Sequence, residues 1–350
     1  MWRKVFSVVF FCLVMFFSAS LTHAAIHVSN YGAATSIATW PNSATGNTAP
    51  TTAISGGLTT LNSPYLIAVD ANWIYVPNFN NNSILVFPAG ATGNVAPTRT
   101  ISGGLTTLNG PVGVAVDANW IYVTNVNNNS ILVFPIGATG NVAPTRTISG
   151  GLTTLNAPVG IAVDANWIYT VSQTSNSILV FPVGATGNTA PTRAISGGAT
   201  NLSVPQGIAV DANWIYTVTY LTNNILVFPI GATGNTAPTR AISGGATNLS
   251  FPGGVAVDAN WIYVVSQANV SVLVFPVGAT GNTAPTRAIS GGATNLSLPW
   301  GIAVDPSALP PPPPPGPTSV PTLNEWGMII FMALAGLGSL YYLGRKRAES

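Results

Sequence analysis

The middle of the chain alternates short runs of β-branched and aromatic residues with polar, glycine-rich turns, and this pattern repeats. The tripeptide Ala-Val-Asp recurs with a constant spacing of 47 residues, and a tryptophan follows each of the first five copies three residues later. A fixed period of this length is typical of propellers and solenoids rather than of independent domains. The repeated aspartates are Asp70, Asp117, Asp164, Asp211, Asp258 and Asp305.

Each period contains four segments with the composition of β-strands. In the third copy they span residues 160–164, 167–171, 177–181 and 192–195, and none is long enough to form a helix. The Ile-Leu-Val-Phe run of the third segment is apolar at consecutive positions, so both faces of its sheet must be covered. Neighbouring blades of a propeller provide that cover. The Asn-, Ser- and Gly-rich connections between the segments are typical of turns.

The two ends of the repeat region are incomplete in a complementary way. The region begins with strand-like segments at residues 26–30, 38–41 and 52–54 and ends with a lone inner strand at 301–305. Pairing that last strand with the first three makes a sixth blade and removes the open ends of the ring. We therefore predict an all-β fold, a six-bladed β-propeller over residues 25–307, closed by its N- and C-terminal strands in one blade. A β-solenoid is the alternative, but it does not explain the complementary ends.

Residues 1–24 have the organisation of a secretory signal peptide. Two basic residues precede an apolar run at residues 5–17, which is short for a membrane span, and small residues follow it. We predict cleavage after Ala24, with a retained membrane anchor as the alternative. The single cysteine, Cys12, lies inside the apolar run, so the mature chain is expected to contain neither a thiol nor a disulfide.

A second membrane-directed segment follows the repeats. A proline-rich linker at residues 308–319 is expected to act as a semi-rigid spacer. Residues 320–350 contain a short motif, an apolar stretch from 327 to 343 and a basic end. As a helix, the apolar stretch reaches about 26 Å, close to the thickness of a hydrocarbon core. We predict a C-terminal transmembrane helix with its basic end in the cytoplasm and the propeller outside.

A short motif precedes this predicted helix and consists of Pro321, Thr322, Leu323, Glu325, Trp326 and Gly327. It resembles the IPTL-type C-terminal sorting signals of Gram-negative bacteria, although Val320 and Asn324 stand where that signal usually has Ile and Ser. The resemblance implies export, anchoring in the inner membrane, processing by an exosortase-like enzyme, and release to the cell surface or matrix. A permanent single-pass anchor is the alternative.

The repeat contains the elements Pro-x-Gly-Ile-Ala-Val-Asp, Ile-Tyr-Val and Ser-Ile-Leu-Val-Phe. Along the repeat region these elements resemble those of the NHL-repeat propellers. Trp replaces the usual Gly before the second strand, and the acidic residue after Tyr-Val is absent. The resemblance implies the fold but no partner. RNA in particular is not expected, because the basic face of RNA-binding relatives is missing.

Charge is scarce in this sequence. Charged residues make up 5% of the chain, against roughly 25% in average soluble proteins. Between residues 26 and 306 there are five Arg, six Asp, His27 and no Lys or Glu. Nucleic-acid binding requires a basic patch, which these residues cannot form. We therefore expect no nucleic-acid partner, and nothing in the sequence indicates a cofactor.

The repeated aspartates are the first candidate site. Six carboxylates at equivalent ends of the inner strands could surround the channel and hold a cation such as Ca²⁺. Alternatively, each aspartate caps its own Asp-Ala-Asn-Trp turn through backbone N–H groups, and repetition in every blade favours that interpretation. The repeated arginines are expected to be exposed charges that discourage pairing at the outer edge. They are Arg99, Arg146, Arg193, Arg240 and Arg287.

Hydrolytic and redox catalysis have little support in the sequence. The predicted propeller contains His27 and no cysteine, lysine or glutamate. A Ser–His–Asp arrangement requires His27, and the repeat singles out no serine. Lactonase-type propellers use mixed carboxylate and amide metal ligands from different blades, which near-identical blades do not supply. We expect no enzymatic activity, and a metal-dependent hydrolase is the remote alternative.

Binding is better sought where the copies differ. The connections between second and third strands vary, and so does the residue after the proline that opens each inner strand. Chain direction puts both variable sets on one face of a propeller, and ring closure makes Tyr65 and Trp300 neighbours. Aromatic rings beside uncharged amides and hydroxyls suit a neutral glycan. Drift in tolerant loops is the alternative. The candidate ligand-binding residues are Tyr65, Phe79, Gln173, Gln206, Tyr220, Gln267 and Trp300.

Together these features predict an exported, non-catalytic propeller that serves as a structural or adhesive component of the cell envelope or its matrix. A propeller that binds a glycan or a small ligand with one face of its ring is the alternative. The expected partners are the export machinery, an exosortase-like enzyme, the membrane and, on the second hypothesis, a polysaccharide.

Overall fold

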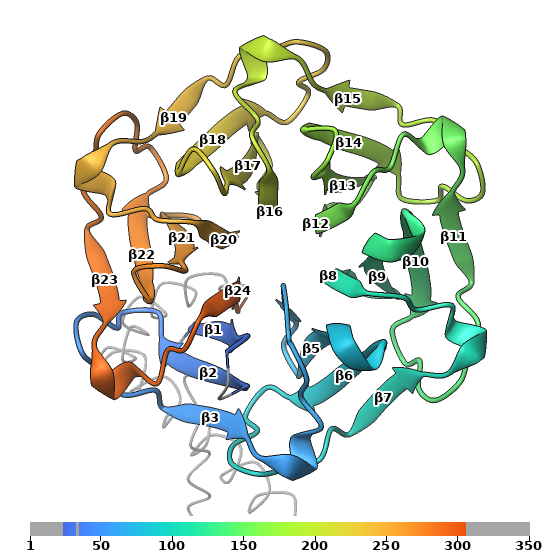
Figure 1. The fold of residues 1–350 in the computed structure, drawn as a ribbon, viewed down its shortest axis with the longest axis horizontal. Helices are drawn as coiled ribbons and strands as arrows, with labels where there is room; N and C mark the ends of the chain where they lie inside the picture. Colours follow the sequence, from blue (N-terminus) through green and yellow to red (C-terminus); the bar gives the residue numbers. More distant parts are fainter. Residues whose placement is uncertain (1–23, 33–34, 306–350) are drawn as a thin grey trace, which may run out of the picture. The chain divides into compact units, whose positions relative to one another are not determined.

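The chain forms a ring of six four-stranded antiparallel sheets (Figure 1). The computed structural model describes residues 24–32 and 35–305. Strands run outward from the axis in chain order within five of the sheets, and the sixth combines both ends of the repeat region. The predicted six-bladed propeller is confirmed.

The strands fall into four concentric sets. The inner strands are β4 (Ala68–Val69), β8 (Pro111–Val116), β12 (Pro158–Val163), β16 (Pro205–Val210), β20 (Pro252–Val257) and β24 (Pro299–Val304). The second strands are β1 (Ala25–Asn30), β5 (Trp73–Asn78), β9 (Trp120–Asn125), β13 (Trp167–Ser172), β17 (Trp214–Thr219) and β21 (Trp261–Ser266). The third strands are β2 (Ser36–Pro41), β6 (Ser83–Pro88), β10 (Ser130–Pro135), β14 (Ser177–Pro182), β18 (Asn224–Pro229) and β22 (Ser271–Pro276). The outer strands are β3 (Thr52–Ser55), β7 (Arg99–Ser102), β11 (Arg146–Ser149), β15 (Arg193–Ile195), β19 (Arg240–Ile242) and β23 (Arg287–Ser290).

Short 3₁₀ turns, which the sequence pattern does not predict, lie in the connections. Six of them join an outer strand to the next inner strand, and two join a second strand to a third. The first group comprises η1 (Gly57–Thr59), η3 (Gly104–Thr106), η5 (Gly151–Thr153), η6 (Gly198–Thr200), η7 (Gly245–Thr247) and η8 (Gly292–Thr294). The second group comprises η2 (Phe79–Asn81) and η4 (Val126–Asn128).

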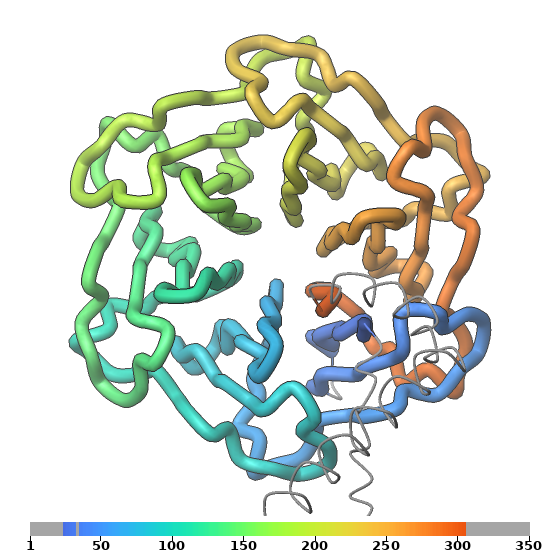
Figure 2. Tube along the Cα trace, turned by 180° about the vertical axis from the view of Figure 1, so that it is seen from behind, coloured from blue at the N-terminus to red at the C-terminus, as the bar shows by residue number. Residues whose placement is uncertain are grey.

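The ring is closed by pairing between the two ends of the repeat region. Strand β24 pairs with β1, with Ala303 opposite His27, and the sheet order is β24-β1-β2-β3. Figure 2 shows the last, orange-red segment beside the first, blue segments. We call this sheet the closing blade. The predicted complementary ends are confirmed.

The core lies between the blades. In β10, the four residues Ile131, Leu132, Val133 and Phe134 are each at most 1% exposed, so both faces of the strand are covered. Residues of β10 pack on the one side with β9 and β5 and on the other with β13 and β14. The apolar run of the third strand is therefore explained by stacking of blades, as predicted.

The outer edge of each blade is covered by the following blade. Ile101 of β7 forms a parallel bridge with Gly140, and Ser102 donates a backbone hydrogen bond to the Gly140 carbonyl at 3.1 Å. Gly103 follows with φ +112°, and a Cβ there would lie 2.6 Å from the side chain of Asn141. Sheet edges that are paired in this way are protected from pairing with other chains.

An asparagine from each following blade accepts a hydrogen bond at this junction. Its Oδ1 binds a backbone N–H of the preceding 3₁₀ turn at 2.7–2.8 Å. The pairs are Asn47–Ala293, Asn94–Leu58, Asn141–Leu105, Asn188–Leu152, Asn235–Ala199 and Asn282–Ala246. We call these contacts the outer asparagine clasps, and they are complete around all six junctions, closure included.

A second set of asparagines joins blades closer to the axis. Each ends the connection between a second and a third strand in a left-handed conformation and accepts a backbone N–H from the next blade at 2.7–2.8 Å. We call these the inner asparagine clasps. Val270 occupies the equivalent position in the blade before closure, also left-handed with φ 46°. The inner clasps are Asn82–Gly110, Asn129–Ala157, Asn176–Val204 and Asn223–Phe251.

Other predictions concern segments outside the described residues. These are the signal peptide before residue 24, the linker at 308–319, and the sorting motif and transmembrane helix at 320–350. Within residues 24–32 and 35–305, no helix is long and apolar enough to cross a membrane.

Candidate functional site

The two variable sets of connections lie against each other on one face of the ring. The backbone N–H of Tyr65, which precedes β4, binds the carbonyl of Pro77 in β5 at 3.2 Å. The N–H of Phe79, in the connection after β5, binds the carbonyl of Ser63 at 3.2 Å. These reciprocal bonds hold the connection into each inner strand against the tip between its second and third strands.

Six aromatic side chains are in contact at this face. Tyr65 is central: its ring centroid lies 5.1 Å from that of Tyr31, 5.2 Å from that of Phe79 and 5.2 Å from that of Trp300. Trp300 also lies 6.0 Å from Tyr220. These separations are typical of favourable tilted and edge-to-face aromatic pairs. We define the aromatic patch as Tyr31, Tyr65, Phe79, Tyr220, Phe251 and Trp300, the last contact being Tyr220–Phe251 at 4.9 Å.

The absence of a side chain at one position allows the patch to form. Trp300 and Tyr220 come from blades separated by the blade of β20, whose residue equivalent to Trp300 is Gly253. A Cβ on Gly253 would lie 2.8 Å from the Trp300 carbonyl. The buried Nε1–H of Trp300 has no hydrogen-bond partner among the described residues, so packing holds this indole in place.

Beneath the patch, the mouth of the channel is filled. Val112 and Val159 are 4% exposed and Gln206 is 3% exposed, and they follow the prolines that open their inner strands. Tyr65 and Trp300 pack against the same cluster as the two valines. Burial raises the pKa of Tyr65 well above its ordinary value. The mouth is thus closed by side chains, and Gln206 is covered.

The structure brings together five of the seven candidate ligand-binding residues. Four belong to the aromatic patch, and Gln267 joins them by accepting a hydrogen bond from the Tyr220 hydroxyl at 3.1 Å. Gln206 lies in the filled mouth. Gln173 lies on the β13–β14 connection, where its N–H binds the Ala157 carbonyl, and no interaction among the described residues joins it to the patch.

Sequence reasoning missed two members of the patch. Tyr31 lies in the connection between β1 and β2 of the incomplete first copy, where the comparison of complete copies does not extend. Phe251 precedes the proline that opens β20 and is 40% exposed. Variation at that preceding position, from Ser63 to Phe251, was the signal that could have identified it.

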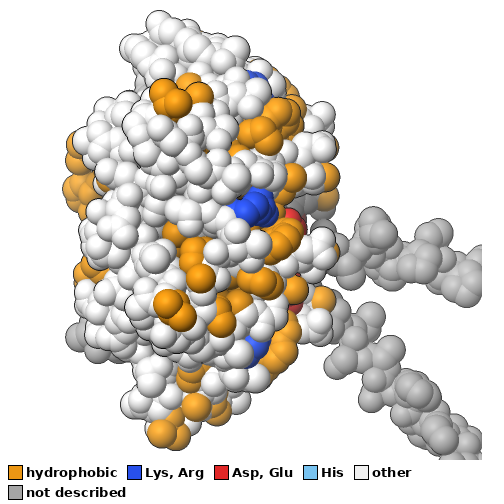
Figure 3. Space-filling view, turned by 90° about the vertical axis from the view of Figure 1, so that its right-hand side faces the viewer, with side chains coloured by type: hydrophobic (Ala, Val, Ile, Leu, Met, Phe, Trp, Pro, Cys, Tyr) orange, Lys and Arg blue, Asp and Glu red, His pale blue; other side chains and the backbone are white. Residues whose placement is uncertain are grey.

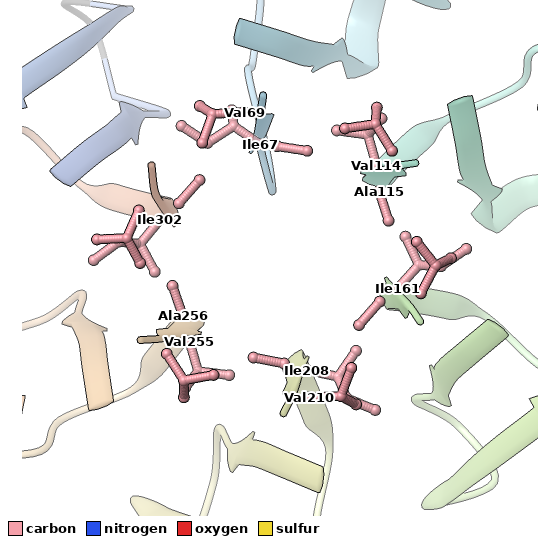
Figure 4. A pocket seen from close by; sticks show the side chains of 18 residues that line it. Ile67, Val69, Val114, Ala115, Ile161, Ile208, Val210, Val255, Ala256 and Ile302 are labelled. Carbon is pink, nitrogen blue, oxygen red and sulfur yellow. The ribbon is translucent and has the colours of Figure 1, made fainter. Parts of the chain in front are cut away.

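Below the filled mouth the channel contains a cavity of about 270 Å³. Six equivalent three-residue segments line it, one from each inner strand, and all of their side chains are Ile, Val or Ala (Figure 4). The segments are residues 67–69, 114–116, 161–163, 208–210, 255–257 and 302–304. Among the residues that the structure describes, no ionisable side chain lines the cavity, so this wall supplies neither an acid–base group nor a carboxylate ligand.

The repeated aspartates cap turns at the end of the inner strands. Asp164 accepts hydrogen bonds at Oδ1 from the N–H groups of Asn166 and Trp167, each at 2.8 Å. Its Oδ2 accepts the hydroxyl of Tyr169 at 2.7 Å. Asp70, Asp117, Asp211 and Asp258 make the same contacts. Both oxygens are thus engaged by the protein, and no group of three metal-ligating side chains occurs within the described residues.

The tyrosine that donates to each of these five aspartates is held in its neutral form. Burial, followed by the hydrogen bond to Asp164, raises the pKa of Tyr169 to about 12. Tyr75, Tyr122 and Tyr216 are shifted to about 12 as well, and burial is again the largest cause. The shift follows from the cost of burying a phenolate beside a carboxylate.

The expectation that the arginines are exposed edge charges is wrong. Arg193 is half-buried, and its guanidinium lies 5.2 Å from the ring centroid of Trp167. It donates to the carbonyl of Ile230 in the next blade. Arg99, Arg146, Arg240 and Arg287 repeat this arrangement. A planar, always charged donor that stacks on an indole stabilises the junction between blades. This arrangement explains why the position holds arginine and not simply any charged residue.

The surface of the ring carries little charge. Figure 3 shows one side of it, where uncharged polar groups and small groups of hydrophobic side chains surround a few isolated arginines and aspartates. Because the arginines and aspartates already bind other groups of the propeller, the aromatic patch presents stacking surfaces and neutral hydrogen-bonding groups.

Comparisons with known proteins agree with this fold and with the predicted C-terminal sorting signal. An IPTL-CTERM motif matches residues 318–347. A chain of the nidogen/laminin complex is similar in structure, with a TM-score of 0.58, 17% identity, and coverage of 80% of this chain and 98% of that one. A candidate 6-phosphogluconolactonase from Bacteroides fragilis gives a TM-score of 0.54 at 14% identity, with 81% and 84% covered. A protein of unknown function from Desulfotomaculum acetoxidans gives 0.54 at 14%, with 81% and 99% covered. No curated protein sequence matched this chain.

These similarities define the class of protein. At such low identity the structural neighbours support the fold alone. The six sheets of the chain itself define it as a six-bladed β-propeller. The chain is a propeller protein that carries an exosortase-type C-terminal sorting signal, and this signal indicates export and attachment at the cell surface.

Proposed function

We propose that this protein is a non-catalytic scaffold, a structural or adhesive component of the cell envelope or the extracellular matrix. The observation that carries the proposal is the internal use of its repeated polar side chains. In five blades the tyrosine binds the aspartate of its own blade, and the arginine binds a carbonyl group of the next blade. The outer asparagine clasps join all six blades. Such a repeat yields a rigid, nearly neutral ring, which suits a building element better than a reaction site.

Retention at the surface tests the scaffold role. In producing cells we would compare the complete chain with a variant that ends at residue 319 and with one carrying Trp326→Ala and Gly327→Ala. Surface or matrix association of the complete chain alone supports the proposal. Equal release of all three proteins into the medium would contradict it.

Catalysis has a separate test. Two structural neighbours are described as candidate 6-phosphogluconolactonases, at 14% and 13% identity. We expect the purified protein to hydrolyse 6-phosphogluconolactone no faster than buffer, with or without added Ca²⁺. Saturable hydrolysis that EDTA abolishes would favour the metal-dependent hydrolase instead.

The second candidate function is recognition of a neutral glycan, and the aromatic patch is the observation that favours it. Its partly exposed rings lie beside Gln267 and hydroxyl groups, and aromatic faces stack on sugar rings. A glycan array would compare the unmodified protein with Trp300→Ala and Phe251→Ala. Leu152→Ala is the matched control, because Leu152 is an equally apolar, 61% exposed residue outside the patch.

Selective binding that both patch variants lose and the control keeps would support a lectin-like propeller. If the unmodified protein binds no glycan, the proposal of glycan recognition is contradicted and the scaffold proposal is unaffected. Binding that survives both substitutions would place any glycan site elsewhere on the ring.

A further inference from the structure

The closing blade lacks the cation that each of the other five blades contains. In those blades an arginine of the outer strand lies over the tryptophan that begins the second strand, and a tyrosine binds the aspartate. In the closing blade Thr52 stands in place of the arginine, Ala25 in place of the tryptophan and His27 in place of the tyrosine. Asp305 is therefore the only repeated aspartate whose own blade supplies no arginine.

Asp305 nevertheless reproduces the capped turn of the other blades across the two ends of the ring. Its Oδ2 accepts the N–H of Ala25 at 3.2 Å, as Asp70 accepts that of Trp73, and Oδ1 lies 3.0 Å from Nε2 of His27. In return, Asp305 donates its N–H to the Ala25 carbonyl at 3.0 Å. His27 is 2% exposed and Asp305 is 28% exposed, so this cluster is partly shielded from water.

We propose that the bond between Ala24 and Ala25 is a processing site whose product completes the ring. Hydrolysis adds one water molecule across this peptide bond and leaves a carboxylate on Ala24, which departs with the leader, and an α-ammonium group on Ala25. The nitrogen that bears the new charge is the one already bonded to Asp305. Removal of the leader thus supplies the closing blade with its missing cation.

The balance of contacts favours this exchange. Cleavage removes one neutral hydrogen bond, from the N–H of Asn42 to the Ala24 carbonyl at 2.8 Å, and Asn42 is half-buried, within reach of water. It replaces a neutral donor at Asp305 by a charged one, and charge-assisted hydrogen bonds are roughly twice as strong as neutral ones. The other ionisable groups here are His27 and, from the adjacent blade, Arg287, which binds the Asn42 carbonyl.

The inference rests on the predicted leader and not on the scaffold role, and the first experiment tests the cleavage itself. N-terminal sequencing of the protein recovered from the surface of producing cells is expected to begin at Ala25. A start at any other residue, or a blocked full-length terminus, would overturn the proposal whatever the outcome of the surface-retention test.

The second experiment tests the ion pair. Chains that run from Ala25 to Ser350, purified in detergent, would be compared with a free terminus, with an acetylated terminus, and with a Gly-Ser extension that moves the ammonium away. At pH 7 we expect calorimetry to give the free terminus a Tm about 2–4 °C above the other two.

The pH dependence distinguishes charge from shape. An α-ammonium bound to a carboxylate has a raised pKa, so its contribution is complete below the unfolded value near 8 and is lost as pH rises through the folded value. The Tm advantage is therefore expected to vanish at pH 10, and Asp305→Asn is expected to abolish it at pH 7. Equal Tm values for the three termini at pH 7, or an advantage that persists at pH 10, would overturn the proposal.

Discussion

Val270 offers a direct test of how the blades are joined. Four of the equivalent residues are asparagines that combine a left-handed backbone with an inner clasp to the next blade. Val270 has the same backbone, with φ 46°, but is β-branched and has no side-chain acceptor for the backbone of the next blade. We predict that Val270→Asn stabilises the protein.

The magnitude follows from two contributions of the same sign. A left-handed conformation costs an ordinary L-residue roughly 1–2 kcal/mol, whereas asparagine adopts it readily. A new hydrogen bond to the N–H of Leu298 is worth about 1 kcal/mol net. Because Val270 is 36% exposed, the loss of its apolar contacts subtracts little. We expect a gain of about 2 kcal/mol, which corresponds to a Tm increase of about 4 °C for a ring of this size.

Differential scanning calorimetry of the purified protein measures this change. Asn176→Val, made at a position where the clasp exists, is the matched reversal and is expected to lower Tm by a similar amount. Val270→Ala removes the β-branch without adding an acceptor and is expected to give less than half of the gain. An unchanged or lower Tm for Val270→Asn would refute the reasoning, because strain and hydrogen bonding act in the same direction.

Other predictions address the repeated contacts. The pKa of Tyr169 is raised to about 12 from its ordinary value of 10.0, so the stabilisation by this tyrosine is complete below pH 10 and is progressively lost from pH 10 to pH 12. The difference in phenolate absorbance between the unmodified protein and Tyr169→Phe reports this side chain, and such a difference at pH 10 in the folded ring would contradict the prediction. Gly150→Ala, at φ +112°, is expected to cost at least about 1 kcal/mol in urea unfolding, whereas Gly151→Ala, with no atom close to the added Cβ, is the control expected to be near neutral. Arg193→Lys is expected to lower the stability by about 1 kcal/mol, because lysine lacks the planar guanidinium that stacks on the Trp167 indole. Thr52→Arg lies in a blade without that indole and is expected to add no stability. Equal Tm values for Arg193→Lys and the unmodified protein would exclude the stacking contribution.

The aromatic patch was only partly predictable. Ring closure predicts Tyr65 and Trp300 as neighbours, and their ring centroids are 5.2 Å apart. The contact between Trp300 and Tyr220 was not predictable, because it passes over a whole blade and depends on the missing side chain of Gly253. Gln206 occupies a variable position like the others, but its side chain is buried and, among the described residues, makes no contact with the patch that resembles those of Tyr65 and Trp300.

The sequence by itself determined the number of blades, the place of each strand and the closure of the ring. A constant period with complementary incomplete ends admits few other arrangements, and alternation of apolar runs with turn residues is a local property. Only the tertiary structure decided which polar side chains bind across the junctions between blades. Except at ring closure, the outer clasps and the arginine bonds join residues 36 and 37 positions apart, across blades whose stacking is set by the twist of the sheets and not by the period. For that reason the arginines, which we expected to be exposed edge charges, were found to join neighbouring blades. Likewise, Asp305 was found to bind Ala25, the residue with which the mature chain is proposed to begin.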